Sequence, residues 1–176
     1  NESYSRIQSA PFDGTIMPIL YIPDWSKPDN QNKSKHFEDI SISEYLQIPQ
    51  YDPLALLDGN LNSKSSNILR YTYITPYMWD YKLDYMEYVW GHLGIDIRSP
   101  IGTPVLSIAN GVVVRTVEAD ATGNKFIVVR HDNVPMDGEK KTFYAWFLHL
   151  SEILVKEGDV VRKGDMIGRV WITGIT

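Results

Sequence analysis

The second half of this 176-residue sequence predicts an all-β fold, an antiparallel β-sandwich, and the first half predicts a mostly irregular N-terminal extension. Short β-branched or aromatic segments recur in the second half with turn-forming residues between them, a pattern typical of antiparallel strands. The first half is instead rich in Pro, Asn, Asp and Ser, and its apolar segments are short. The predicted strands cover residues 104–109, 112–118, 125–131, 142–149 and 166–171.

Glycine-containing turns separate these strands. Asn110-Gly111 lies between two apolar runs and predicts a two-residue hairpin turn. Thr122-Gly123-Asn124, Met136-Asp137-Gly138 and Lys163-Gly164-Asp165 divide the remaining strands in the same way.

Two parts of the second half share one pattern. Gly102-Thr103-Pro104-Val105 precedes Gly111-Val112-Val113, and Gly158-Asp159-Val160-Val161 precedes Gly168-Arg169-Val170. Each copy contains one strand, a turn and a second strand, which indicates a duplicated, hybrid-motif sandwich. Biotinyl and lipoyl carrier domains share this motif, but no Met-Lys-Met or Asp-Lys hairpin tip for modification is present here.

Residues 1–70 form the predicted extension, and residues 71–176 form the predicted domain. Ser41-Ile42-Ser43-Glu44 has the spacing of a capping box, so a short helix is expected to start there and to end before Pro49. A second helical turn is predicted over residues 53–57, and a linker over residues 60–67.

Composition excludes several classes of function. The net charge of -5 argues against a basic surface that binds nucleic acid. Because the sequence has no cysteine, a metal site must use His, Asp or Glu. No apolar run approaches the roughly 18–20 residues of a membrane span. The first residue is Asn1 rather than Met, which is compatible with removal of an upstream secretion signal or anchor.

His92 and Asp96 have the spacing of a possible metal site. In a straight strand two residues four positions apart lie roughly 13 Å from each other, too far to share one metal ion. The backbone must therefore bend between them, and Gly94 at the midpoint is where a bend costs least.

Several segments, including this motif, occur in order along residues 71–176. They are Gly91-His92-Leu93-Gly94-Ile95-Asp96, Gly102-Thr103-Pro104-Val105, Asn110-Gly111-Val112-Val113, Gly123-Asn124 leading into Val128-Val129-Arg130-His131, His149-Leu150-Ser151, and the run from Gly158 to Gly168. This pattern resembles the lysostaphin/LytM family of zinc metallopeptidases. The resemblance implies a LytM-like sandwich in which His92 and Asp96 are two of three zinc ligands. It also implies that His149 is a catalytic residue that orients or deprotonates the attacking water. The implied substrate is the peptide cross-link of bacterial peptidoglycan, in the periplasm, the cell envelope or the extracellular space.

The family also has a later His-x-His that supplies a further catalytic His and the third ligand, and no such motif precedes Thr176. Three hypotheses account for this. The chain is a truncated form of an active peptidase, which the intact His92, Asp96 and His149 favour. It is a degenerate LytM-like module that binds the cell wall or activates another hydrolase. Or it recruits His131 or His36 as the missing ligand.

Pattern alone gives the histidines simpler interpretations. His131 ends a predicted strand, and the resembling family usually carries a His there that does not bind metal. His36 lies among charged residues and is interpreted as a solvated surface residue. His149 shares a predicted strand face with Phe143 and Phe147, so alternation alone indicates a core histidine.

Two hypotheses concern the region before His92. Its aromatic side chains, Tyr77, Trp79 and Trp90 among them, form either an ordinary core or the wall of a groove for an extended peptide or glycan. Some latent members of the resembling family place an upstream side chain on the open zinc position. The extension over residues 1–70 is a candidate for that role.

Overall fold

The computed structural model describes residues 4–23, 34–46, 74–75, 80–81, 90–91, 94–97, 99–121 and 123–171. The chain divides into two units, which are considered separately: Asn1–Tyr21 with Pro100–Thr176, and Ile22–Ser99. Antiparallel strands dominate the described residues of both units. The predicted all-β class is confirmed.

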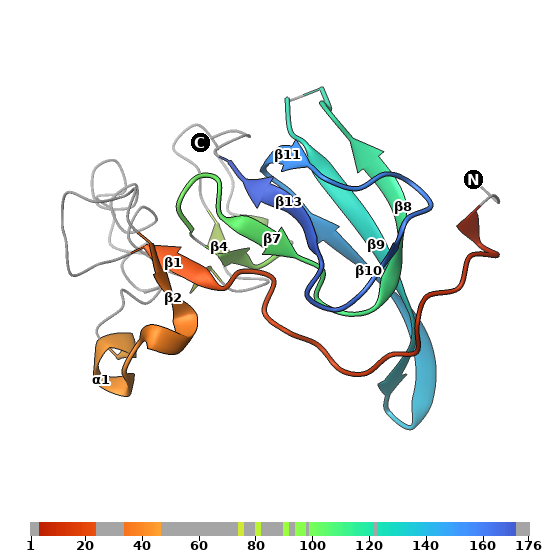
Figure 1. Ribbon diagram of the computed structural model, residues 1–176, viewed down its shortest axis with the longest axis horizontal. Helices are drawn as coiled ribbons and strands as arrows, with labels where there is room; N and C mark the ends of the chain where they lie inside the picture. The colour runs from red at the N-terminus through yellow and green to blue at the C-terminus, as the bar shows by residue number, and fades with distance from the viewer. Residues whose placement is uncertain are drawn as a thin grey trace. The chain divides into compact units, whose positions relative to one another are not determined.

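The first unit contains a four-stranded sheet with the order β10-β9-β8-β12 and a three-stranded sheet with the order β11-β13-β7 (Figure 1). Their strands are β7 (Pro104–Leu106), β8 (Gly111–Val117), β9 (Phe126–Met136), β10 (Glu139–Phe147), β11 (Leu150–Ile153), β12 (Val160–Val161) and β13 (Met166–Val170). Every pairing within these two sheets is antiparallel.

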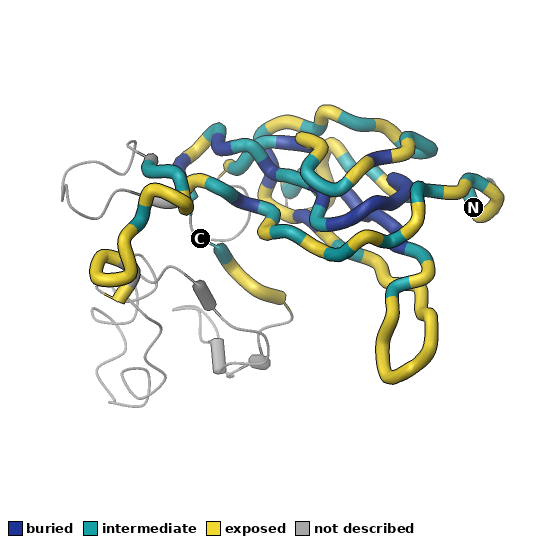
Figure 2. Tube along the Cα trace, turned by 60° about the horizontal axis from the view of Figure 1, so that its bottom comes forward, coloured by how far each residue is buried: buried dark blue, intermediate teal, exposed yellow. Residues whose placement is uncertain are grey.

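Apolar side chains from both sheets form the core of this unit. Ile127 and Val129 alternate on β9 and are fully buried, as are Leu150 on β11 and Ile167 on β13. Each such side chain contributes roughly 1.5–3 kcal/mol through removal of apolar surface from water. The tube in Figure 2 shows this buried centre, together with an exposed β9–β10 hairpin that projects from it.

The two copies of the predicted duplication pair with each other. In one sheet β7 of the first copy pairs with β13 of the second, and in the other sheet β8 pairs with β12. Gly111 and Gly168 occupy equivalent places in the two copies, and neither has room for a Cβ atom. Such an atom would lie 2.6 Å from the Arg130 carbonyl oxygen at Gly111, and 2.8 Å from the Glu152 carbonyl oxygen at Gly168. The duplicated, hybrid-motif sandwich is confirmed.

The prediction of a hairpin turn at Asn110-Gly111 is wrong, because β7 and β8 belong to different sheets. A two-residue type I′ hairpin needs positive φ at both central residues, and neither Asn110 nor Gly111 has it. The Asn110 side chain instead bonds to distant backbone: its Nδ2 donates to the Pro11 carbonyl at 2.6 Å, and its Oδ1 accepts from the Lys163 N–H at 3.0 Å. The tight hairpin turn of this unit is Asp137-Gly138, with φ of 53° and 78°.

Gly111→Ala is expected to destabilise the protein by about 1–3 kcal/mol, because the new methyl group meets backbone that cannot move aside easily. The change is measured as a lower midpoint of urea denaturation. Gly94→Ala is the matched control, since a Cβ at Gly94 meets nothing within 4 Å. Equal stability of the two variants would contradict the close packing at Gly111.

The N-terminal arm, residues 4–20, packs along the sheets of the first unit without forming a strand (Figure 1). The Ile16 N–H donates to the Ile108 carbonyl at 2.9 Å, and the Leu106 N–H donates to the Pro18 carbonyl at 2.8 Å. The Ile19 side chain is buried. The arm is therefore joined to the sheets by backbone hydrogen bonds and by apolar contact.

The second unit has short elements. They are β1 (Tyr21–Pro23, which starts in the first unit), β2 (Ser34–His36), η2 (Phe37–Asp39), α1 (Ile42–Tyr45), β3 (Ile74–Thr75), β4 (Asp80–Tyr81), β5 (Trp90–Gly91) and β6 (Asp96–Ile97). β1 pairs with β2, β3 with β6, and β4 with β5. The predicted capping box is confirmed, because Ser41 caps α1 and Glu44 bonds back to its N–H at 2.9 Å. None of the helices in the described segments has the length and apolar character to cross a membrane.

Several predictions fall outside the described residues. These are the helical turn over residues 53–57, the linker over residues 60–67, the boundary at residue 70, and the positions of Tyr77 and Trp79. They remain predictions, as does the aromatic groove.

Candidate active site

His149 lies at the corner where the chain leaves the four-stranded sheet and enters the three-stranded sheet, between β10 and β11. Its side chain is exposed, whereas Phe147 and Leu150 on either side are buried. The interpretation of His149 as a core histidine is therefore wrong. The strand alternation that suggested it ends at Phe147, before the corner.

The backbone of His149 is strained. Its φ is 58°, in the left-handed region, which costs an L-residue other than glycine about 1–2 kcal/mol. The surrounding hydrogen bonds hold this conformation: the Trp171 N–H donates to the His149 carbonyl at 2.9 Å, and the Leu150 N–H donates to the Lys125 carbonyl at 3.2 Å. Strain at an exposed imidazole is a reason to suspect a functional role there.

Asp96 begins β6, where it pairs with Thr75 of β3. The backbone bends at Gly94, as the spacing of His92 and Asp96 required, and the Asp96 side chain is exposed. His92 itself lies outside the described residues. Its role as a ligand remains a prediction.

The chemistry of the donors fits zinc. Zinc in proteins accepts carboxylate oxygen and neutral imidazole nitrogen, and Asp96 and His149 present these groups at exposed positions. They belong to different units. In the described segments no three His, Asp or Glu side chains gather at one point.

His131 has a structural role, as expected. It is buried, and its Nδ1 lies 3.0 Å from the Asn110 carbonyl oxygen. Because a carbonyl only accepts, Nδ1 carries the proton, and Nε2 has no partner among the described atoms. Burial lowers the pKa of His131, against the smaller raising effects of the Asn110 carbonyl and the Asp132 charge. His131 is therefore a neutral core residue.

His36 also has a partner. Its Nδ1 accepts the Glu38 N–H at 3.2 Å and so caps η2. The side chain is 25% exposed, which makes it a half-buried cap rather than a freely solvated residue. Neither His131 nor His36 belongs to a cluster of metal-binding groups in the described part of the chain.

The lowered pKa of His131 predicts a loss of stability in acid. Stability is expected to be full above the unfolded-state pKa of about 6.5 and to fall as the pH drops below it, because the unfolded chain then binds the proton more readily. Urea midpoints measured between pH 8 and pH 5 should decline less in His131→Gln than in the unmodified protein. His36→Gln is the control, and its urea midpoint should decline between pH 8 and pH 5 as much as that of the unmodified protein. A His131→Gln variant with an unchanged slope would assign the pH dependence to another group.

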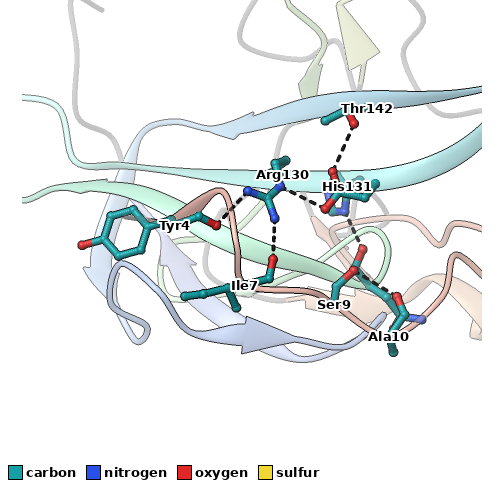
Figure 3. Close-up of polar contacts among 9 residues, drawn as sticks. Tyr4, Ile7, Ser9, Ala10, Arg130, His131 and Thr142 are labelled. Atoms are coloured by element: carbon teal, nitrogen blue, oxygen red, sulfur yellow. Dashed lines mark hydrogen bonds and ion pairs between the residues drawn. The ribbon is translucent and has the colours of Figure 1, made fainter. Parts of the chain in front are cut away.

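Arg130 forms a buried network that the sequence did not indicate. Its Nη1 donates to the Tyr4 carbonyl at 2.9 Å and its Nη2 to the Ile7 carbonyl at 2.6 Å, and its Nε lies 3.0 Å from Asp132 (Figure 3). Thr142 adds a hydrogen bond to the other oxygen of Asp132. The sequence does contain one signal of this network. Arg130 lies within the apolar run of β9, and a buried charge needs hydrogen-bonding partners.

A strained, exposed imidazole at a corner between two sheets and an exposed carboxylate after a bend are groups that a metal-dependent hydrolase uses. Comparison with known proteins supports the peptidase, and so the hydrolase, part of this description. Residues 91–176 match the model of Peptidase family M23. This part of the chain is similar to that family, and the predicted resemblance to the lysostaphin/LytM family is confirmed.

Three similar proteins illustrate the relationship. Peptidoglycan DD-endopeptidase ShyA of Vibrio cholerae is 42% identical over 83 residues, which cover 47% of this chain and 17% of ShyA. Lysostaphin of Staphylococcus staphylolyticus is 34% identical over 84 residues, which cover 47% of this chain and 16% of lysostaphin. A crystal structure of a zinc-containing peptidase from Vibrio cholerae is 31% identical, with a TM-score of 0.47, over 58% of this chain and 29% of that chain. The chain thus spans less than a fifth of the length of both curated relatives.

Proposed function

We propose that this chain is part of a zinc-dependent endopeptidase that hydrolyses peptide cross-links of bacterial peptidoglycan. The observation that carries the proposal is the exposed, strained His149 within the segment that matches the peptidase family. His92 and Asp96 would hold the metal, and His149 would act in catalysis. Peptidoglycan lies outside the cytoplasm, so the proposed location is the periplasm, the cell envelope or the extracellular space.

Each of these residues has one chemical task. When bound, zinc polarises the scissile carbonyl and activates water at neutral pH. Asp96 would supply an anionic oxygen ligand from the start of β6. The His149 imidazole accepts a proton from the attacking water and returns it to the leaving amine. The backbone hydrogen bonds at the corner fix the position from which the imidazole projects.

Two measurements on the full-length protein test the proposal. Zinc content is determined by mass spectrometry, and release of muropeptides from purified peptidoglycan is followed by chromatography. Zinc near one equivalent and hydrolysis that stops with a chelator and returns with zinc are expected. Zinc without hydrolysis would favour a non-catalytic LytM-like module that binds the wall or activates another hydrolase. Absence of both would overturn the proposal.

A further inference from the structure

The outer face of the four-stranded sheet in the first unit contains an open cleft of about 660 Å³. Its lining consists of residues 114–117 of β8, Arg130 of β9, Tyr144 of β10, Tyr4, Ser5 and Glu157. All of these residues belong to the first unit. None of them is a residue of the candidate active site.

Strand register places an aromatic side chain and a cation on this outer face. Trp146 pairs with Val128, and Val128 pairs with Arg115, so the three residues form one row across β10, β9 and β8. Val128 is buried between its neighbours, whereas Trp146 is 59% exposed. Tyr144, two residues earlier on the same face, is 58% exposed.

The Trp146 ring is fixed in position. It stacks on Phe126 with ring centroids 5.5 Å apart and an angle of 17° between the planes. A fixed, exposed indole offers a flat apolar surface that a ligand can cover at little cost in side-chain entropy.

Arg115 is exposed and forms no ion pair or side-chain hydrogen bond with any residue in the described segments. Two other arginines of the unit are paired, Arg130 with Asp132 and Arg169 with Glu152. A guanidinium in a cleft that has no carboxylate partner among the described residues attracts an anionic group through charge-assisted hydrogen bonds.

Tyr4 and Glu157, which also line the cleft, supply neutral and acidic hydrogen-bonding groups. Glu157 accepts the Thr116 N–H at 3.3 Å. It also hydrogen-bonds the Tyr4 hydroxyl, which raises the pKa of Tyr4. A carboxylate held beside a phenol can accept hydrogen bonds from ligand hydroxyl groups. The cleft therefore holds a cation and an acceptor of hydroxyl groups. The Trp146 ring, which is not part of the cleft lining, adds an apolar plane in the same row as Arg115.

We propose that this outer-face cleft binds the sugar strand of peptidoglycan, where the muramic acid carries a free lactyl carboxylate. The choice of polymer rests on the proposed function. The C–H face of an N-acetylated sugar stacks on Trp146, the lactyl carboxylate pairs with Arg115, and sugar hydroxyls reach Glu157. A free lactyl carboxylate exists only where the stem peptide has been removed, so the cleft recognises peptide-free stretches of the strand.

Binding to the full-length protein tests the proposal without any hydrolysis. The probes are peptide-free glycan strands, a neutral tetramer of N-acetylglucosamine, and isolated stem tetrapeptides, each titrated by calorimetry. The peptide-free strands are expected to bind, the neutral tetramer to bind more weakly, and the tetrapeptides not to bind. Tetrapeptide binding without glycan binding, or no binding of either polymer component, would overturn the proposal.

Variants locate the site. Trp146→Ala and Arg115→Ala are each expected to weaken glycan binding about tenfold, as loss of a central aromatic or arginine side chain commonly does. The matched controls are Phe143→Ala, 40% exposed on the opposite face of β10, and Arg162→Ala, an exposed arginine outside the cleft. If circular dichroism shows that Trp146→Ala does not fold, Arg115→Glu is tested in its place. Arg115→Glu is expected to abolish binding of the glycan strands. Equal binding by the cleft variants and the controls would reject this site.

The two proposals fail in different ways. If the full-length protein contains zinc and releases muropeptides but does not bind glycan strands, only the cleft proposal is lost. If it binds glycan strands through Trp146 and Arg115 but neither holds zinc nor hydrolyses peptidoglycan, the proposed enzyme function is lost.

Discussion

Replacing Asp96 with Ala in the full-length protein is expected to remove zinc and peptidoglycan hydrolysis together. Zinc sites in proteins generally use three or four protein ligands, so loss of an anionic oxygen ligand weakens the whole site. Replacing His149 is expected to leave zinc in place and to lower the rate of hydrolysis by roughly 100- to 10,000-fold, the usual contribution of a general acid–base. Zinc per protein molecule and the initial rate of muropeptide release separate the two effects.

The left-handed backbone of His149 decides which substitution is informative. Alanine at φ 58° would be as strained as histidine, whereas asparagine tolerates this region well. His149→Asn therefore removes the imidazole and keeps the corner. Glu118→Ala is the control for loss of an exposed acid, since among the described residues Glu118 forms just a surface ion pair, with Lys125. A His149→Asn variant with near-normal hydrolysis would exclude His149 from catalysis, and an Asp96→Ala variant with normal zinc would exclude Asp96 as a ligand.

Local sequence patterns predicted those parts of the fold that depend on neighbouring residues. Three such features are present in the structure: the alternation of β-branched residues, the capping box at Ser41 and the repeated glycines at 111 and 168. Each of them depends on residues that are close together in the sequence. The pairing of the two copies with each other, β7 with β13 and β8 with β12, was found only in the structure.

Interactions between distant parts of the sequence were not predictable in this way. Asn110-Gly111 has the composition of a hairpin turn, but the Asn110 side chain is used to bond Pro11 and Lys163, far away in the sequence. The corner at His149 exists because the chain changes sheets after Phe147, which alternation cannot show. Arg130 bonds to carbonyl groups 126 and 123 positions away, so no local pattern could pair them.

The N-terminal arm gives the second large expected effect. Removing residues 1–20 is expected to destabilise the protein by about 3–6 kcal/mol, because the buried Arg130 guanidinium loses two carbonyl acceptors, each worth roughly 1.5–3 kcal/mol to a charged donor. Loss of the Pro11 carbonyl from Asn110 and of the buried Ile19 side chain adds to this. Such a loss is a large fraction of the 5–15 kcal/mol that is typical for a whole domain. Urea denaturation measures it directly.

A second substitution shows whether Arg130 is the cause. Arg130→Met in the shortened chain should recover part of the lost stability, since it removes the buried charge whose acceptors are gone. In the intact chain the same substitution should give no such gain. If the arm served only to occlude the active site, the shortened chain would instead keep its stability and gain hydrolytic activity. A test of latency must therefore keep residues 4–20 in place, because their removal is expected to destabilise the unit that carries His149 and so to lower activity for a reason unrelated to inhibition.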